Sequence, residues 1–275
     1  MTLQTMDRES SLTLIRMVDN LPSLPDRYTR IREVIEDPHA GAADLARIVG
    51  TDQATTAMVL KFANSSLHNP MGKNIASLSM AVARLGTRET AQIGMAMSLI
   101  YGFAIPAGMT HIRALWGHAF GVALLAKHMA ALLDYDQDAL FTIGLLHDIG
   151  RAILGIRVDM DYFESSLGNM QGEELIAAEQ AAFGLDHGEA GAELLKLWRF
   201  PSIVCQTVRD HHSKESSSIA VKIVQIASTE VHHALSGAAD IDSVEELLFA
   251  DPERPRQLLE DAGLIEAREQ DATED

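Results

Sequence analysis

The stretch ALFTIGLLHDIG, residues 139–150, combines a helical apolar period with an adjacent imidazole and carboxylate. Its apolar residues recur three and four positions apart, which predicts a helix with one buried face. His147 and Asp148 stand next to each other near its end, and such a pair can bind one metal ion from a single helical turn. The pair could instead be a satisfied polar contact between two helices, and for a lone pair this second interpretation is the more common one.

Helical periodicity continues along nearly the whole chain, for example in residues 120–133 and 219–235. No stretch alternates apolar and polar residues as a half-buried strand does. Helix boundaries agree with this pattern, because Asp186 followed by Glu189 forms a capping box for a helix that ends near Trp198. The sequence therefore predicts an all-α protein.

Length and composition indicate a globular protein, because 275 residues that are 47% apolar can bury a sizeable core. The longest apolar run, roughly residues 93–109, is interrupted by Gly102 and Pro106, and the first ten residues lack the basic flank of a signal peptide. We therefore expect no membrane span and no membrane partner. Cys205 is the only cysteine, so an intrachain disulfide is impossible and a reducing cytoplasm fits.

The formal net charge of −17 is unevenly distributed. The first 105 residues carry 10 basic and 10 acidic side chains, residues 106–234 carry 9 and 16, and the last 41 residues carry 3 and 13. The acidic part repels nucleic acid and phosphodiesters at long range unless a cation is bound. From these differences we predict a neutral N-terminal helical lobe at 1–105, a second helical lobe at 106–235, and an acidic, partly disordered extension at 236–275.

A series of motifs runs along the chain in a recognisable order. Residues 21–70 hold Leu-Pro pairs, a helix containing Leu-Ala, and an Asp-led helix ending in Ala-Asn-Ser; an Ala-x-x-x-Leu-Gly segment follows in residues 76–86. This order resembles the opening of an HDOD domain. Later blocks are similar to later blocks of the same family, so the resemblance covers roughly residues 14–235; these blocks are 115–130, 141–154, 179–201 and 208–212.

The resemblance implies an all-helical, two-lobed HDOD fold whose C-terminal lobe is of the HD phosphohydrolase type. Such domains serve mostly as non-catalytic signalling modules in bacteria. In the related HD-GYP phosphodiesterases of cyclic di-GMP, the metal ligands follow the order His, His-Asp, His, His-His and a final Asp. Arg151 stands where those enzymes have a lysine that can contact the phosphate. Carried onto this chain, six of the seven ligands are kept: His118, His147, Asp148, His187, His211 and His212.

The seventh position holds Ser228, which alters the expected metal chemistry. A hydroxyl brings no negative charge and must lose a proton to become a strong donor. We therefore expect a divalent transition metal, such as manganese or iron, to bind weakly or not at all. Only the segment SKESSS, residues 213–218, follows His212 before the next helix, and the Gly-Tyr-Pro segment of the phosphodiesterases is absent from it. Hydrolysis of cyclic di-GMP is therefore not expected.

Two functions remain open after these observations. The first, favoured by the missing carboxylate, is a cytoplasmic signal-transduction module that acts without catalysis by binding a partner protein or a small ligand. Its interaction surface is expected on the N-terminal lobe and the groove beside it. The alternative is a metal-dependent phosphohydrolase that acts on a nucleotide or a phosphodiester, with Arg151 on the phosphate. Direct DNA binding is disfavoured, because the second helix of the helix-turn-helix-like residues 44–66 offers only Lys61 as a basic contact.

Overall fold

The structure is a computed structural model, and every regular element in its described part is a helix. The predicted all-α class is therefore confirmed. The described residues are 5–17, 25–65, 68–72, 74–102, 110–159, 161–163, 165–234 and 251–266.

Consecutive helices near the N-terminus form the first lobe. The helices are α2 (Asp26–Glu36), α3 (Ala42–Val49), α4 (Gln53–Asn64), α5 (Leu78–Leu85) and α6 (Thr87–Gly102). Within this lobe the last of these five helices, α6, packs against the first, α2, and the third, α4. Asp52 caps the third by accepting a hydrogen bond from the backbone N–H of Thr55. Thr55 and Met58 of this helix are buried, so neither of these two side chains is available to contact DNA.

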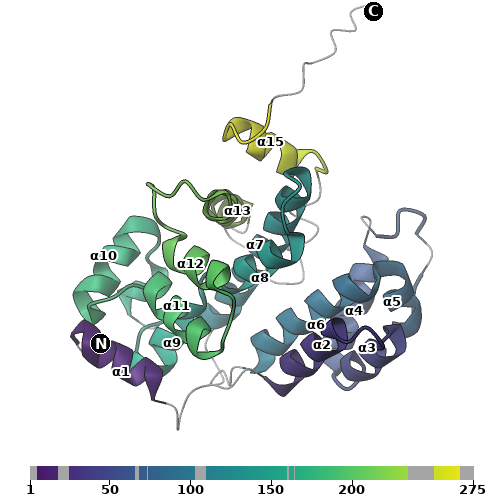
Figure 1. Cartoon of the computed structure of the whole chain (residues 1–275), viewed down its shortest axis with the longest axis horizontal. Helices are drawn as coiled ribbons and strands as arrows, with labels where there is room; N and C mark the ends of the chain where they lie inside the picture. Colours follow the sequence, from purple (N-terminus) through teal and green to yellow (C-terminus); the bar gives the residue numbers. More distant parts are fainter. Residues whose placement is uncertain are drawn as a thin grey trace, which may run out of the picture.

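The second lobe follows and surrounds the stretch that carries His147 and Asp148. Its helices are α7 (Thr110–Leu132), α8 (Gln137–Leu146), α9 (Ile149–Ile153), the π-helical turn η2 (Leu154–Val158), the 3-10 turn η3 (Ser166–Asn169), α10 (Gly172–Phe183), α11 (His187–Leu197), α12 (Ser202–Asp210) and α13 (Ile219–Ala234). α7 packs along α8 and α13, and α11 packs against α9 and α12. Figure 1 shows this lobe beside the group α2 to α6.

α1 (Arg8–Arg16) packs on the second lobe, although it precedes the first lobe in the chain. The Ser11 hydroxyl donates a hydrogen bond to the carbonyl of Phe183, at 2.9 Å, and Arg8 forms an ion pair with Glu189. In Figure 1, α1 lies against α10 and α11, apart from α2. The prediction that put residues 1–105 in one lobe followed chain order and charge, and neither records this long-range packing.

The predicted boundary near residue 105 falls in residues 103–109, outside the described part of the chain. In the C-terminal extension, α15 (Arg254–Asp261) packs against α7, and its Leu259 is completely buried. Arg254 donates two hydrogen bonds to the carboxylate of Glu230 on α13, at 2.7 and 2.8 Å. The extension therefore contributes a packed helix, whereas the disorder predicted for its end concerns residues outside the described ranges.

The two lobes meet along α7. The rings of Phe62 in α4 and Phe120 in α7 contact edge to face, with centroids 5.6 Å apart. Further along α7, the ammonium of Lys127 donates hydrogen bonds to Glu89 and Gln92 of α6, at 2.6 and 2.7 Å. α7 therefore joins the first lobe to the centre of the second, and further contacts between the lobes pair Gln92 with Asp138 of α8 and Tyr28 with Phe200.

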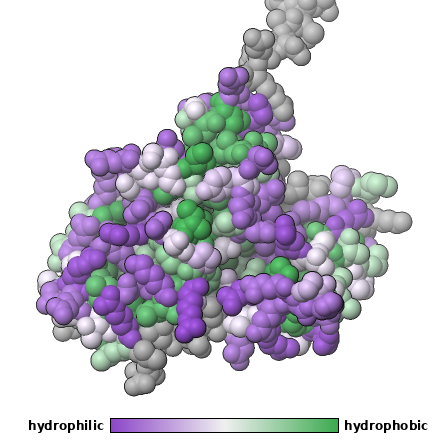
Figure 2. All heavy atoms as spheres, viewed as in Figure 1, coloured by the Kyte–Doolittle hydropathy of each residue, from purple (hydrophilic) through white to green (hydrophobic). Residues whose placement is uncertain are grey.

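Among the described residues, one helical stretch, Gln137–Ile156, is long and apolar enough to cross a membrane by length and composition alone. Of its most apolar window, 78% is buried inside the protein, as expected for a core helix. Hydrophilic side chains cover most of the face drawn in Figure 2, with apolar side chains scattered between them.

Candidate metal centre

His147 and Asp148 lie at the break between α8 and α9. The buried ring of His147 donates a hydrogen bond from Nδ1 to the carbonyl of Gly144, at 2.7 Å, because a carbonyl can only accept. Its Nε2 therefore carries a bare lone pair. That atom lies 3.6 Å from Oδ1 of Asp148 and has no hydrogen-bond partner among the described residues.

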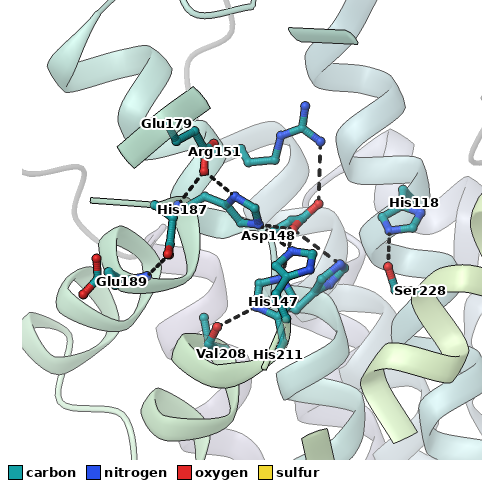
Figure 3. Close-up of polar contacts among 12 residues, drawn as sticks. His118, His147, Asp148, Arg151, Glu179, His187, Glu189, Val208, His211 and Ser228 are labelled. Carbon is teal, nitrogen blue, oxygen red and sulfur yellow. Dashed lines mark hydrogen bonds and ion pairs between the residues drawn. The ribbon is translucent and has the colours of Figure 1, made fainter. Parts of the chain in front are cut away.

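His187 and His211 bring two further imidazoles to the same carboxylate oxygen (Figure 3). His187 is the first residue of α11, and its Nε2 lies 3.4 Å from Oδ1 of Asp148. His211 follows α12, and its Nε2 lies 3.5 Å from that oxygen. The Nδ1 of His211 donates to the carbonyl of Val208, at 2.6 Å, so its buried Nε2 is also left without a partner.

Glycines allow the helices that carry these side chains to approach closely. A Cβ atom at Gly150 in α9 would lie 1.8 Å from the carbonyl oxygen of His187. A Cβ atom at Gly188 in α11 would lie 2.7 Å from the carbonyl oxygen of Arg209 in α12. Since real Cβ contacts do not occur at such distances, larger residues here would separate Asp148 from the histidines.

The remaining predicted ligands flank this group. Nε2 of His212 lies 2.9 Å from Nε2 of His187. The ring centroid of His118, on α7, lies 5.3 Å from the ring centroid of His147. All six predicted residues therefore surround one site, although their role as metal ligands remains a prediction. Their donor atoms form two groups that share the aspartate: Asp148, His187, His211 and His212, and His118, His147 and Asp148.

The donor set fits a divalent metal ion. Nitrogen and oxygen atoms bound at about 2.1 Å to one ion lie roughly 3.0 to 3.4 Å apart. Oδ1 of Asp148 is 3.4 to 3.6 Å from its three imidazole neighbours. Two of those nitrogens are buried without a partner, a costly arrangement that a bound ion would relieve. Imidazole together with carboxylate suits zinc, iron and manganese.

A buried glutamate that the sequence analysis missed orients His187. Glu179 in α10 is completely buried, and its Oε2 accepts hydrogen bonds from Nδ1 and from the backbone N–H of His187, at 2.7 and 2.8 Å. Its Oε1 accepts a hydrogen bond from the hydroxyl of Tyr162. Glu179 precedes His187 by eight residues across a helix end, so no helical period indicates their contact.

Burial keeps two of the histidines neutral at pH 7. It lowers the pKa of His118 to about 4 and the pKa of His147 to about 3, although the Asp148 carboxylate opposes both shifts. A neutral imidazole is the form that binds a metal ion. These two side chains therefore need not lose a proton when an ion enters.

His187 is different, because it contacts two carboxylates. Burial alone would lower its pKa, but Glu179 and Asp148 together raise that pKa to about 10. Burial and the neighbouring imidazoles of His211 and His187 lower the pKa of His212. In the metal-free protein His187 therefore carries the proton and donates it from Nε2 to Nε2 of His212.

Asp148 remains a carboxylate at neutral pH. Burial would raise its pKa, but the adjacent imidazoles of His147, His187 and His211 hold that pKa well below its ordinary value. The centre therefore keeps one negative charge at the atom on which the imidazoles converge.

A cavity of about 780 Å³ is lined by five of the six residues: His118, Asp148, His187, His211 and His212. Arg151 forms part of its wall: its Nε donates to the hydroxyl of Tyr162 and its Nη2 to the carbonyl of Gly168, each at 3.3 Å. Nη1 lies 3.9 Å from Oδ2 of Asp148. A fixed positive charge thus stands beside the donor set, where it can bind an anion. At the rim, Lys214 and Glu173 form an ion pair.

α13 forms the opposite wall with Ser228, Thr229 and His232. His232 lies beyond the motifs that match the family, but its spacing of four residues from Ser228 places both on one helical face. Glu230 is an acidic residue two positions beyond Ser228, but its side chain pairs with Arg254 of α15. Glu230 therefore does not supply the carboxylate that Ser228 lacks.

The model of the HDOD domain family matches residues 21–214, and the chain belongs to this family. An HDOD domain protein of unknown function from Geobacter sulfurreducens has a similar structure, with a TM-score of 0.68 and 29% identity. The match covers 92% of this chain and 89% of that one. The family resemblance found in the sequence is therefore confirmed.

More distant solved structures share the fold. A candidate metal-dependent phosphohydrolase from Shewanella amazonensis matches with a TM-score of 0.59 and 20% identity, over 91% of this chain and 94% of that one. A candidate signal transduction protein from Marinobacter aquaeolei matches with a TM-score of 0.57 and 21% identity, over 95% of this chain and 62% of that one. At these identities the likeness concerns the fold alone.

Curated relatives are longer than the part that matches. An uncharacterised protein of Treponema pallidum is 25% identical over 77% of this chain, and the match spans 41% of that protein. Ribonuclease Y of Mycoplasma genitalium is 26% identical over 40% of this chain, and the match spans 17% of the enzyme. The chain thus corresponds to less than half the length of each.

Proposed function

We propose that this chain is a bacterial signal-transduction module that works in the cytoplasm by binding, without catalysis. In this proposal a divalent transition metal ion, such as Mn(II) or Fe(II), occupies the group around Asp148. A small phosphate-bearing ligand then binds beside it in the cavity. The binding of a partner protein then depends on whether this site is occupied.

The observation that carries the metal proposal is the convergence on Oδ1 of Asp148. Three imidazole nitrogens lie 3.4 to 3.6 Å from this oxygen, and two of them, on His147 and His211, are buried without a hydrogen-bond partner. Hydrogen bonds from each Nδ1 to a carbonyl or carboxylate fix the rings so that Nε2 faces the centre. A site that is organised in this way favours an ion over water.

Charge and cavity size support an anionic small ligand. The chain carries a net charge of −17, so an anion approaches against the overall field unless a local cation attracts it. Arg151 and the ion would supply two such charges within one cavity. Its volume of about 780 Å³ lies within the range of small-molecule sites, about 300–1,000 Å³.

Ser228 is the reason to prefer binding over turnover. A metal ion supports hydrolysis by lowering the pKa of a bound water molecule and holding the phosphoryl oxygens. The group that contains His118 has Ser228 beside it, where the phosphodiesterases have a carboxylate, and Glu230 is engaged elsewhere. An ion held by that incomplete group would bind weakly.

The first lobe is the proposed surface for the partner protein. Phe120, two residues after His118 in α7, packs on Phe62 of the first lobe, so a shift of α7 on ligand binding would reach α4. Hydrogen–deuterium exchange with and without Mn(II) tests this path. Altered protection in α4 and α6 supports it, and changes confined to the second lobe argue against it.

Metal content and turnover test the central proposal together. The full chain is purified without chelator, its metal content is measured, and hydrolysis of p-nitrophenyl phosphate and bis(p-nitrophenyl) phosphate is followed. We expect bound metal and no turnover, and loss of the metal in Asp148→Ala. The control Asp26→Ala, an exposed carboxylate of α2, should retain the metal.

A second candidate function is a metal-dependent phosphohydrolase that acts on a nucleotide or a phosphodiester. The observation that favours it is the sharing of Asp148 by two donor groups beside Arg151, because two ions joined by one carboxylate can hold both the nucleophile and the phosphate. Turnover by the wild type that disappears in Asp148→Ala, but not in Asp26→Ala, would replace the binding proposal with this one.

A further inference from the structure

We infer that Glu179 is a positioning residue that couples the metal site to the anion site. One of its oxygens holds the metal ligand His187, and the other holds Arg151 through Tyr162. The inference rests on the proposed function, in which the cavity takes a metal ion and an anion. It adds that one buried carboxylate orients a binding group for each of the two.

The contact with His187 fixes a metal ligand in two ways. Oε2 of Glu179 accepts from both the ring Nδ1 and the backbone N–H of His187, at 2.7 and 2.8 Å. The backbone bond caps the first residue of α11, and the ring bond sets the rotation of the imidazole. Its Nε2 consequently faces Asp148, and the carboxylate makes that nitrogen a stronger donor.

The contact with Arg151 has a fixed hydrogen-bond direction. The Tyr162 hydroxyl has one proton, and it donates that proton to Oε1 of Glu179. Its oxygen is then left to accept from Nε of Arg151, at 3.3 Å. With Nη2 bound to the carbonyl of Gly168, Nη1 is directed toward Asp148 and the cavity.

Burial makes this chain of contacts difficult to replace. Glu179 and Tyr162 are completely buried, and His187 is 1% exposed, so water cannot substitute for a lost partner. His187 and Arg151, at the two ends of this series of hydrogen bonds, line the same cavity. A carboxylate that only capped α11 would not need the second branch through Tyr162.

The experiment separates the two branches of Glu179. Mn(II) affinity is measured by calorimetry on the full chain after removal of metal, and inorganic phosphate affinity on the Mn(II)-loaded chain. Tyr162→Phe should lower phosphate affinity about tenfold and change Mn(II) affinity less than about twofold. Glu179→Gln keeps the shape of the side chain and should lower both, with a loss of about 10- to 100-fold for Mn(II) once the affinity is corrected for the proton that leaves His187.

Double variants distinguish positioning from a purely structural role. If Glu179 acts through Tyr162 and His187, then adding Glu179→Gln to the Tyr162→Phe variant causes no further loss of phosphate affinity. It likewise causes no further loss of Mn(II) affinity in His187→Ala. Additive losses in both cycles overturn the inference. The control Ser11→Ala removes another buried hydrogen bond to α10 and should change neither affinity.

The possible failures can be told apart. If the wild type binds neither Mn(II) nor phosphate, the proposed function fails and the inference falls with it. If the wild type binds both and the cycles are additive, only the inference is wrong. If circular dichroism shows that Glu179→Gln folds poorly, the test depends on Tyr162→Phe alone. In that variant, equal losses of Mn(II) and phosphate affinity, or no loss of phosphate affinity, overturn the inference.

Discussion

The hydroxyl oxygen of Ser228 lies 3.2 Å from Nε2 of His118, across the gap between α13 and α7. This contact shows that position 228 faces the cavity, as the sequence comparison with the phosphodiesterases implied. The backbone thus holds a side chain where a ligand would be needed, while the side chain itself has no charge.

Ser228→Asp is therefore expected to raise metal affinity. A carboxylate adds a charged oxygen next to His118, where other donor atoms already converge, and calorimetry with Mn(II) should show a gain of about tenfold or more. Ser217→Asp is the matched control, because it makes the same change at an exposed serine two residues before α13. Equal affinities in wild type and Ser228→Asp would contradict a metal role for the His118 group.

Gly150→Ala is expected to disrupt the centre from the backbone. The added Cβ would lie 1.8 Å from the carbonyl oxygen of His187, so α9 and α11 must move apart. We expect the free energy of unfolding to fall by about 3 kcal/mol or more, above the usual range for overpacking, together with a loss of metal binding. Gly41→Ala, which meets no atom within 4 Å, serves as the control in the same urea titration. A stable variant that still binds metal would show that this close approach is dispensable.

Local signals in the sequence predicted the parts of the fold that local chemistry determines. Asp186 caps α11 as expected, since its side chain accepts the backbone N–H of Glu189, although the Glu189 carboxylate pairs with Arg8 of α1. The family order of motifs also brought the six predicted ligands to one site. These features depend on short spacings or on a fold already known for the family.

Long-range pairings could not be predicted in this way. Glu179 lies eight residues before His187, and Arg254 lies 24 residues after Glu230, with no periodic relation in either case. The place of α1 on the second lobe depends on contacts such as that of Ser11 with Phe183, which are 172 residues apart. Buried partners of this kind become visible only when the helices are packed.

Arg254→Ala is expected to loosen α15 without affecting the metal centre. Arg254 is 42% exposed, so the ion pair with Glu230 contributes at most about 1 kcal/mol, and Leu259 remains as an apolar anchor. Hydrogen–deuterium exchange should therefore rise in residues 251–266, while Mn(II) affinity stays within about twofold of the wild type. A marked change in Mn(II) affinity would instead indicate that α15 supports the cavity wall through α13.

Metal binding should release one proton from His187. Because Glu179 and Asp148, against the effect of burial, raise the pKa of His187 to about 10, this side chain is protonated at pH 7 in the metal-free protein and donates to His212. A metal ion takes the place of that proton on Nε2. Each unit of pH from about 7 to 9 should then raise the association constant for Mn(II) about tenfold, and the rise should end above about pH 10.

The sign of this dependence follows from the direction of the pKa shift. His118 and His147, with pKa values lowered by burial to about 4 and about 3, are neutral throughout this range and add no slope. Calorimetry at pH 8 in two buffers of different ionisation enthalpy should give about one proton released per ion bound. In Glu179→Gln the pKa of His187 falls toward its ordinary value, so proton release at pH 8 should drop. An association constant that is flat between pH 7 and 9 would mean that His187 is already neutral, or that the ion binds without it.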